Sequence, residues 1–319
     1  MSNSKIVSFG STRRKNTGPK DDISLSQVLD TQTETVVLFG KSWQLHVKEV
    51  LNTTLEENLN MIYDSIRYLR EQGREIIFDA EHYFDGFKSD PDYALRTLMS
   101  AEKAGARAIV LCDTNGGTLT HDVELITRKT VTKIGSKVGV HCHNDTGLAV
   151  ANTLAAVKSG VSHIQGTVNG FGERCGNADL CQVIPSLKFK MGLDVLGKGK
   201  TSKESLKELT SLSRYVYELT NIPPKAHQPY VGSGAFSHKA GMHVNAILKH
   251  SGAYEHIDPE VVGNKRRFLI SELAGKSGIV KIASDLGFDI AKRSDVVENI
   301  LEQVKKLESE GYHLENADA

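Results

Sequence analysis

Residues 138–145 read Val-Gly-Val-His-Cys-His-Asn-Asp, a short apolar run that passes directly into polar side chains. Successive side chains of a β-strand alternate between its two faces, so His141 and His143 are predicted to point the same way. Two imidazoles side by side at a strand end provide half of a divalent-metal site, and the Asn-Asp that follows supplies oxygen ligands or acceptors behind them. A pair of hydrogen-bonded structural histidines is the alternative.

The same pattern of an apolar run followed by a polar or glycine-rich tail recurs along the chain. Amphipathic stretches of helical length separate most of these runs, and repeated strand–helix units imply parallel strands with helices outside. The predicted strands cover residues 6–9, 36–39, 76–78, 108–112, 138–140 and 161–164.

Three helices between these strands have recognisable ends. The clearest covers residues 55–72, where Thr54 with Glu57 forms a capping-box start and Gly73 is a C-terminal stop. The second begins at Asp90-Pro91 and ends at Gly105, and the third is predicted over residues 148–158 with its end at Gly160.

Polar residues after nearly every strand are typical of a barrel enzyme, whose active site is built from the loops that follow the strands. A doubly wound open sheet is the alternative, but it would gather polar residues at one switch point. We therefore predict an α/β fold, a (β/α)8 TIM barrel. Only six strands precede the end of the pattern near Gly192, so the barrel is predicted to be two βα units short and to occupy residues 1–197.

The remainder, residues 198–319, is predicted to be a helical linker followed by mostly helical subdomains. Residues 198–207 are polar and read as the linker, and residues 206–219 as a helix. Residues 222–241 are rich in Pro, Gly and Ser and read as an ordered loop, whereas 278–311 give two amphipathic helices.

The composition excludes several classes of partner. Lys plus Arg and Asp plus Glu both number 39, so no net field favours nucleic acid or an anionic membrane. No apolar run approaches the roughly 18 residues that span a bilayer. The four cysteines have no paired spacing, and residues 1–8 lack the apolar core of a signal peptide. We therefore expect a cytoplasmic protein with reduced thiols.

Two strand tails carry candidate catalytic and binding side chains. Glu81 stands at the predicted barrel mouth, where a carboxylate can act as a general base or hold a substrate, and partial burial would raise its pKa. A solvated loop acid is the alternative. Thr114, in the tail over residues 113–117, offers a hydroxyl beside backbone N–H groups that suit a small carboxylate. The alternative there is a turn of the Asx type.

Two further segments hold polar residues. The glycine-rich loop over residues 169–178 can bring Arg174 and Asn177 onto an anionic or metal-bound ligand. It lacks the lysine of a P-loop and the glycine spacing of the dinucleotide fingerprint. Further along, His243 and Tyr254 could act as a proton-transfer pair, although polar residues on such a loop are more often plain surface.

Taken together, residues 141–147, 169–178 and 231–243 closely resemble the acyl-CoA-condensing metalloenzymes, a family with an HMG-CoA-lyase-like TIM barrel that includes isopropylmalate, homocitrate and citramalate synthases. Residues 6–14, 39–43 and 79–86 are most similar to the citramalate synthase branch. The resemblance spans nearly the whole chain. It implies an acyltransferase that condenses acetyl-CoA with pyruvate and hydrolyses the thioester, giving (R)-citramalate for isoleucine biosynthesis.

The resemblance also implies a metal site and a homodimer. The bound ion is a divalent metal (Mg, Mn, Zn or Co) that chelates the 2-oxo acid and polarises its ketone. His141 and His143 match the family's two histidine ligands, and Asn177 matches an asparagine that lies at or next to the metal. Glu81 matches the catalytic glutamate, and Thr114 matches the threonine that binds the carboxylate of the oxo acid. His243 and Tyr254 match a pair that, in relatives, enters from the neighbouring subunit. Many relatives have Asp where this chain has Asn245.

Relatives begin with a strand carrying an Asp-Arg-Glu signature, whose aspartate is a third protein ligand and whose arginine stabilises the oxyanion. The similarity here starts at what should be the third strand, so we expect the first two βα units to be absent and this polypeptide alone to be poorly active or inactive. Three alternatives stay open: a 2-isopropylmalate synthase acting on a longer 2-oxo acid, an HMG-CoA-lyase-type enzyme, and a non-catalytic truncated remnant.

Overall fold

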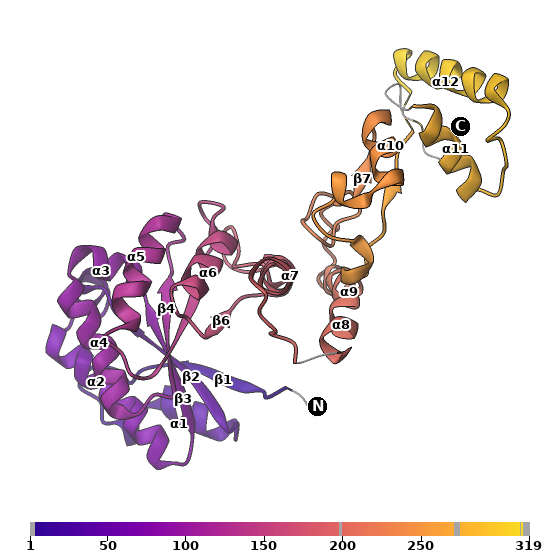
Figure 1. Ribbon diagram of the computed structural model, residues 1–319. Coiled ribbons are helices and arrows are strands. Elements are labelled where there is room, and N and C mark those ends of the chain that lie inside the picture. The colour runs from indigo at the N-terminus through magenta and orange to yellow at the C-terminus, as the bar shows by residue number, and fades with distance from the viewer. Residues whose placement is uncertain (1–3, 198–199, 271–274, 313, 315–319) are drawn as a thin grey trace. The chain divides into compact units, whose positions relative to one another are not determined.

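The computed structural model describes residues 4–197, 200–270, 275–312 and 314 (Figure 1). They form two units with their own internal contacts, Met1–Val183 and Ile184–Ala319. The domain boundary predicted between residues 197 and 198 lies beyond this division and stays a prediction, because 198 and 199 lie outside the described residues.

Six parallel strands form the sheet of the first unit, and all six predicted strands are confirmed. They are β1 (Val7–Ser11), β2 (Thr35–Lys41), β3 (Glu75–Glu81), β4 (Ala108–Asp113), β5 (Lys137–Cys142) and β6 (His163–Gln165). Each strand pairs with the next one along the chain. This unbroken order is that of a barrel wall, whereas a doubly wound sheet reverses its order at a switch point. Among the described residues no pairing joins β1 to β6.

The three helices predicted for the first unit begin and end within one residue of their predicted bounds. Thr54 accepts a hydrogen bond from the Glu57 amide, and Asp90 accepts one from the Tyr93 amide. The unit contains α1 (Ile23–Asp30), α2 (Leu55–Glu71), α3 (Tyr83–Ser89), α4 (Pro91–Ala104), α5 (Thr120–Val131), α6 (Ala149–Lys158) and the start of α7 (Leu180–Met191), with short turns η1 (Pro19–Asp21), η2 (His46–Val50) and η3 (Val168–Gly170).

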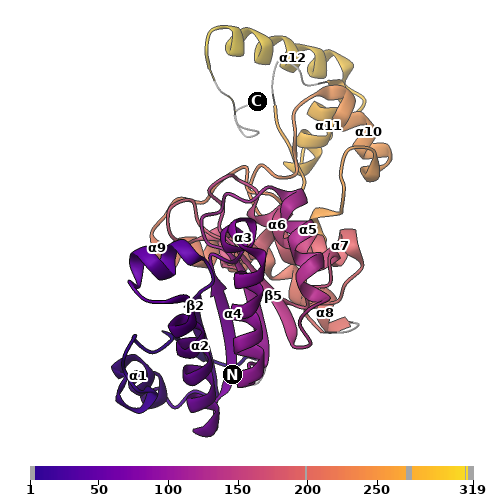
Figure 2. The same ribbon diagram turned by 90° about the vertical axis from the view of Figure 1, so that its left-hand side faces the viewer.

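The two faces of the sheet have different surroundings. Val36, Leu38, Ile76 and Phe78 alternate along β2 and β3 and are fully buried on the helix side. In Figure 2 the helices α2 and α4 lie in front of the strands on that side. The intervening residues face the other way and line a hollow. Helices therefore cover one face and leave the other for side chains that bind or react, as in a barrel.

The second unit is mostly helical, as predicted. Its two short strands pair in parallel, and its apolar core gathers around Val244, Phe268, Ile279 and Val297. The elements are α8 (Lys200–Lys207), α9 (Leu209–Thr220), β7 (Ser237–His238), α10 (Gly241–Lys249), η4 (Ser251–Ala253), η5 (Pro259–Val262), β8 (Arg267–Phe268), α11 (Lys276–Asp285) and α12 (Ser294–Ser309).

The segment predicted as a linker is helical over most of its length, because α8 covers Lys200–Lys207. Leu206 and Leu209 are buried, and the Thr210 hydroxyl donates to the Val262 carbonyl. This packing outweighs the polar composition that reads as a linker. Across the described residues, none of the helices is both long and apolar enough to cross a membrane.

Candidate active site

The inner face of the sheet forms a hollow of about 780 Å³ in the first unit. Because side chains alternate along a strand, every second residue of each strand reaches it. The sequence-predicted residues Glu81, Thr114, His141 and His143 all line this hollow, together with Asp79 and Gln165. The structure therefore brings together four candidates from the ends of three neighbouring strands.

The histidine pair converges as its spacing predicts. His141 lies on β5 and His143 directly follows it, and their Nε2 atoms are 3.3 Å apart. Burial lowers the pKa of both imidazoles, and for His143 the neighbouring His141 lowers it further. Both rings are therefore neutral near pH 7, which is the form that ligates a metal.

Asn177 is held opposite His143 by backbone pairing. The Asn144 amide donates to the Gly176 carbonyl at 2.9 Å, and the Ala178 amide donates to the Cys142 carbonyl at 3.0 Å. The side-chain nitrogen Nδ2 of Asn177 donates to the Phe171 carbonyl at 3.0 Å, so the side-chain oxygen Oδ1 points in the opposite direction. This oxygen is buried and makes no hydrogen bond of standard geometry among the described residues, although the Asn177 side chain is close enough to His141 to oppose the lowering of its pKa.

These atoms fit a divalent cation. Two neutral imidazole nitrogens and an orphaned amide oxygen are donors of the kinds that Zn²⁺, Mn²⁺ and Co²⁺ accept. Within the described residues no group of three or more His, Cys, Asp or Glu side chains could hold a metal, so the set consists of two nitrogens and an amide. The next two residues do not point at the pair: Asn144 Oδ1 accepts the Ala149 amide, and Asp145 binds Arg174.

Glu81 ends β3 and is held at the rim of the hollow by a lysine that the sequence reasoning did not select. Lys41 on β2 lies beside Glu81 in the parallel register, and its Nζ is 2.5 Å from Glu81 Oε2. The alternative of a solvated loop acid does not describe this carboxylate, because its side chain is 22% exposed. Lys41 could have been selected from the sequence because it comes soon after the apolar run 36–39, at the polar end of β2.

Thr114 is positioned by an unusual backbone conformation at His82. His82 has a left-handed backbone, with φ of 58°, and its amide donates to Thr114 Oγ1 at 2.8 Å. The Thr114 hydroxyl proton is thereby left to donate elsewhere. Next to it, Asp113 accepts hydrogen bonds from both the amide and the hydroxyl of Thr118, five residues further along, which is a wider closure than an Asx turn.

Arg174 is engaged with protein groups. Its guanidinium binds both oxygens of Asp145, at 2.7 and 3.0 Å, and donates to the Thr114 carbonyl at 2.7 Å. These contacts fasten the glycine-rich loop to the ends of β4 and β5. A substrate-binding role for Arg174 stays a prediction.

Gln165 and Asp79 also lie in the hollow and were not singled out from the sequence. Gln165 Oε1 is 2.9 Å from His141 Nδ1, and Gln165 Nε2 donates to Asp79 Oδ1 at 2.8 Å. Burial raises the pKa of Asp79 to about 7, and the hydrogen bond from Gln165 opposes this shift. Strand periodicity places both residues on the inner face, but only the register of six strands shows that they meet.

His243 and Tyr254 belong to the second unit, whereas the other predicted site residues belong to the first. Their ring centroids are 4.1 Å apart, with 31° between the ring planes, so the structure confirms them as neighbours. Tyr254 is 47% exposed. The pair is therefore accessible from solvent within its own unit.

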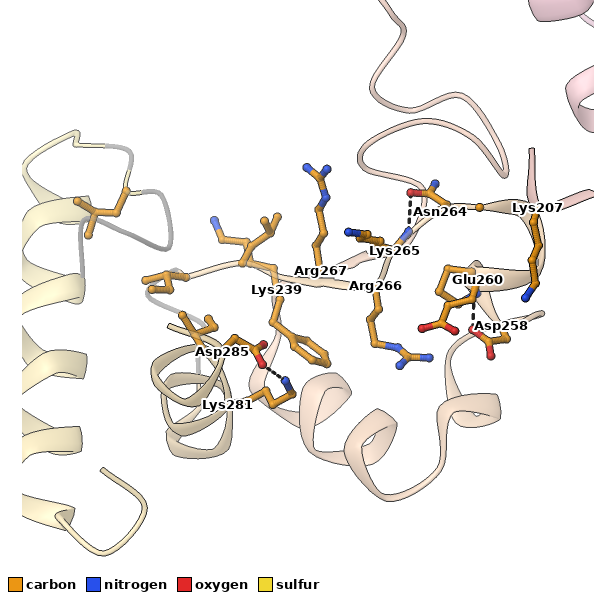
Figure 3. A pocket seen from close by; sticks show the side chains of 17 residues that line it. Lys207, Lys239, Asp258, Glu260, Asn264, Lys265, Arg266, Arg267, Lys281 and Asp285 are labelled. Atoms are coloured by element: carbon orange, nitrogen blue, oxygen red, sulfur yellow. Dashed lines mark hydrogen bonds and ion pairs between the residues drawn. The ribbon is translucent and has the colours of Figure 1, made fainter. Parts of the chain in front are cut away.

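The second unit also contains a groove of about 900 Å³ (Figure 3). Arg266, which precedes β8, and Arg267, which begins it, point to opposite sides of the backbone there. Arg266 binds the buried Glu255 carboxylate at 2.7 Å, and Lys281 pairs with Asp285. The groove's basic residues are Lys207, Lys239, Lys265, Arg266, Arg267 and Lys281. None of the predicted site residues lines this groove.

Known proteins resemble the chain along its whole length. The model of the HMGL-like family matches residues 16–216, and that of the homocitrate synthase post-HMGL domain-like family matches residues 230–312. The chain is 50% identical to the (R)-citramalate synthase of Sulfolobus acidocaldarius over 100% of its own length and 60% of that protein. It is 36% identical to the 2-isopropylmalate synthase of the same organism, over 94% of the chain and 74% of that protein.

A solved structure supports the fold. The HMG-CoA lyase of Bacillus subtilis matches with a TM-score of 0.55 and 17% identity, covering 67% of this chain and 70% of that one. This likeness confirms the predicted α/β barrel class, while the absence of two βα units stays a prediction. The chain spans about 60% of the length of the citramalate synthase that it matches.

Proposed function

Since this chain belongs to the HMGL-like family, we propose that it serves the condensation of acetyl-CoA with pyruvate to (R)-citramalate. The observation that carries the proposal is the convergence of His141 and His143, whose Nε2 atoms are 3.3 Å apart at the carboxyl end of β5. The choice of pyruvate rests on identity, which is 50% to a citramalate synthase and 36% to a 2-isopropylmalate synthase.

The metal ligands are His141, His143 and Asn177. A divalent cation bound there would polarise the ketone of the 2-oxo acid. Asn177 Oδ1 is the only oxygen of this set, and its lack of a hydrogen-bond partner among the described residues leaves it free to ligate. Neutral donors add no negative charge to the site, so we expect weaker metal binding than at a site completed by a carboxylate.

Glu81 is the general base. Its carboxylate takes a proton from the methyl group of acetyl-CoA, and the carbon left behind forms a bond to the ketone carbon of pyruvate. The former ketone oxygen takes up a proton and becomes the hydroxyl of the product. Water then cleaves the thioester and releases CoA. Lys41 holds Glu81 at the rim through their ion pair of 2.5 Å.

Thr114 binds the carboxylate of the oxo acid. Because its oxygen already accepts the His82 amide, the hydroxyl proton is directed to the substrate. Arg174 supports this by holding the Thr114 carbonyl at 2.7 Å. In this proposal Arg174 reaches the substrate only through Thr114.

His243 and Tyr254 supply the proton to the new alkoxide, and they do so from the second subunit of a homodimer. Their rings are in contact and Tyr254 is half exposed, so the pair is available to a neighbouring chain. Mixing inactive His141→Ala chains with inactive His243→Ala chains tests the arrangement. Mixed dimers are expected to regain activity, because one of their two sites has both intact parts. No regain in a confirmed mixed dimer would contradict a shared site.

The substrate is tested by comparing 2-oxo acids. The purified chain with Mn²⁺ and acetyl-CoA is given pyruvate, 2-oxoisovalerate or 2-oxoglutarate, and product is measured by chromatography because the exposed Cys175 would react with thiol reagents. We expect slow turnover with a preference of at least about tenfold for pyruvate, the size of effect that one or two methylenes have in a pocket. Equal or faster reaction of 2-oxoisovalerate would favour a 2-isopropylmalate synthase.

Binding gives a second readout if turnover is slow. Pyruvate is expected to tighten Mn²⁺ binding in calorimetry, because the oxo acid adds two oxygen ligands to the ion. Cleavage of HMG-CoA with no reaction of pyruvate would favour a lyase. Absence of Mn²⁺ binding with and without pyruvate would contradict the proposed site.

A further inference from the structure

The His141 imidazole is held from behind by a glutamine on the neighbouring strand. In the parallel register His141 on β5 lies beside Gln165 on β6. Gln165 Oε1 is 2.9 Å from His141 Nδ1, the ring nitrogen that faces away from His143. Which of the two ring nitrogens carries the proton therefore depends on which end of the Gln165 amide faces the ring.

The direction of this contact is set by a third strand. Gln165 Nε2 donates to Asp79 Oδ1 at 2.8 Å, and Asp79 is 6% exposed on β3. An ionised Asp79 carboxylate can only accept, so it binds the nitrogen of the Gln165 amide and leaves the amide oxygen for His141. The oxygen can only accept, and His141 must then carry its proton on Nδ1. Its Nε2 then carries no proton and directs its lone pair at His143 Nε2, 3.3 Å away.

We propose that Gln165 and Asp79 are positioning residues that lock His141 in the tautomer able to ligate a metal through Nε2. Neither residue touches the proposed ligand atoms, and both act through the orientation of one amide. The inference rests on the proposed metal site for its purpose, but the lock itself is a property of the metal-free chain.

Alternative side chains break the lock in different ways. Gln165→Met keeps the size of the side chain and removes both hydrogen bonds, so the His141 proton is free to move to Nε2. Gln165→Glu keeps an oxygen that accepts from His141 Nδ1. Asp79→Leu removes the acceptor that orients the amide and allows Gln165 to turn its nitrogen toward His141. The three substitutions therefore distinguish the effect of the Gln165 oxygen, which accepts from His141, from the effect of Asp79, which orients the Gln165 amide.

The tautomer is read directly in the metal-free chain. Long-range ¹H–¹⁵N spectra distinguish a protonated ring nitrogen from an unprotonated one, and assignment by the His141→Gln variant identifies the signals. The lock predicts a protonated Nδ1 and an unprotonated Nε2 in the wild type, and loss of this preference in Gln165→Met. A wild-type His141 that carries its proton on Nε2 would overturn the inference.

Metal affinity gives the second test. By calorimetry with Mn²⁺ we expect Gln165→Met to bind about tenfold or more weakly, Asp79→Leu to be weakened in the same direction, and Gln165→Glu to retain affinity within about threefold. Thermal unfolding verifies that each variant is folded. Equal affinity of folded Gln165→Met and wild type would overturn the positioning role.

A matched control is available elsewhere in the same unit. Gln182 Nε2 donates to Asp179 Oδ2 at 2.9 Å, so Gln182→Met loses the same kind of glutamine–aspartate bond without removing the hydrogen-bond partner of His141 Nδ1. It should keep wild-type Mn²⁺ affinity and the wild-type His141 tautomer. If the tautomer is locked as predicted but the wild type binds no Mn²⁺, the lock is supported and the proposed function fails.

Discussion

The hollow of the first unit and the groove of the second are similar in size, at about 780 and 900 Å³, but they differ in what their polar atoms do. The groove gathers more charge, and Arg266 and Lys281 there already bind carboxylates. The hollow has fewer charges, yet His143 Nδ1 and Asn177 Oδ1 beside it are buried with no partner among the described residues. Unsatisfied buried polar atoms cost free energy, so two of them beside a histidine pair indicate a bound ligand more strongly than charges that are already paired.

The largest effect is expected from removing a ligand. His141→Ala should reduce Mn²⁺ affinity by at least about a hundredfold, because it removes one of two nitrogens, and should abolish pyruvate-dependent product. Calorimetry and chromatography measure the two quantities. Lys265→Ala and Arg267→Ala in the groove are the controls and should change neither. A larger loss from the groove variants than from His141→Ala would reverse the comparison between the two regions.

The groove is expected to matter for stability. Glu255 is buried and binds both Arg266 and His238, so Glu255→Ala leaves a guanidinium without its partner. We expect a loss of about 3 kcal/mol in the free energy of unfolding of the second unit. Denaturant unfolding and hydrogen exchange of residues 237–268 measure this loss, and Mn²⁺ affinity should stay unchanged. Wild-type stability of the variant would show that the network does not support the fold.

The buried Asp79 makes the first unit sensitive to pH. Its pKa is raised by burial from 3.8 to about 7, so the folded state keeps this proton over a range where the unfolded chain has lost it. The resulting stabilisation is complete below about pH 4 and is lost as the pH rises through about 7. Between pH 5 and 8 the wild type should lose about 3 kcal/mol more than Asp79→Asn. The free energy of unfolding of both chains is measured in urea at a series of pH values. An equal change in the wild type and in Asp79→Asn would contradict the raised pKa of Asp79.

The smallest effect concerns the glycine-rich loop. A Cβ atom at Gly172 would collide with the side-chain nitrogen Nδ2 of Asn177, whereas a Cβ atom at Gly117 would meet nothing within 4 Å. Gly172→Ala should therefore shift Asn177 and weaken Mn²⁺ binding by about tenfold, while Gly117→Ala serves as the control. Calorimetry of both variants is sufficient. Equal affinities would indicate that Asn177 contributes nothing to the site.

Local pattern was sufficient to predict the strands and the histidine pair. An apolar run followed by a polar tail identifies each strand end, and a period of two residues places His141 and His143 on one face. The capping residues Thr54 and Asp90 likewise act on amides only three residues away. Such features depend on neighbours in the chain, so they are visible before the fold is known.

The partners across the sheet could not be predicted in this way. Gln165 meets Asp79 across 86 residues, and Lys41 meets Glu81 across 40. Either contact depends on the strand order and register, which a single strand does not encode. Arg174 illustrates the same limit, since its ion pair with Asp145 spans 29 residues and depends on the fold of the glycine-rich loop.

The alternation along β2 and β3 has a consequence for laboratory evolution. Leu38 and Phe78 pack under the helices, whereas the adjacent Phe39 and Ile77 face the hollow. Libraries restricted to the hollow-facing positions should change the choice of acid while sparing the packing that keeps the chain folded. Inserting one residue within either strand would exchange the two sets, so viable length changes should be confined to the connecting loops.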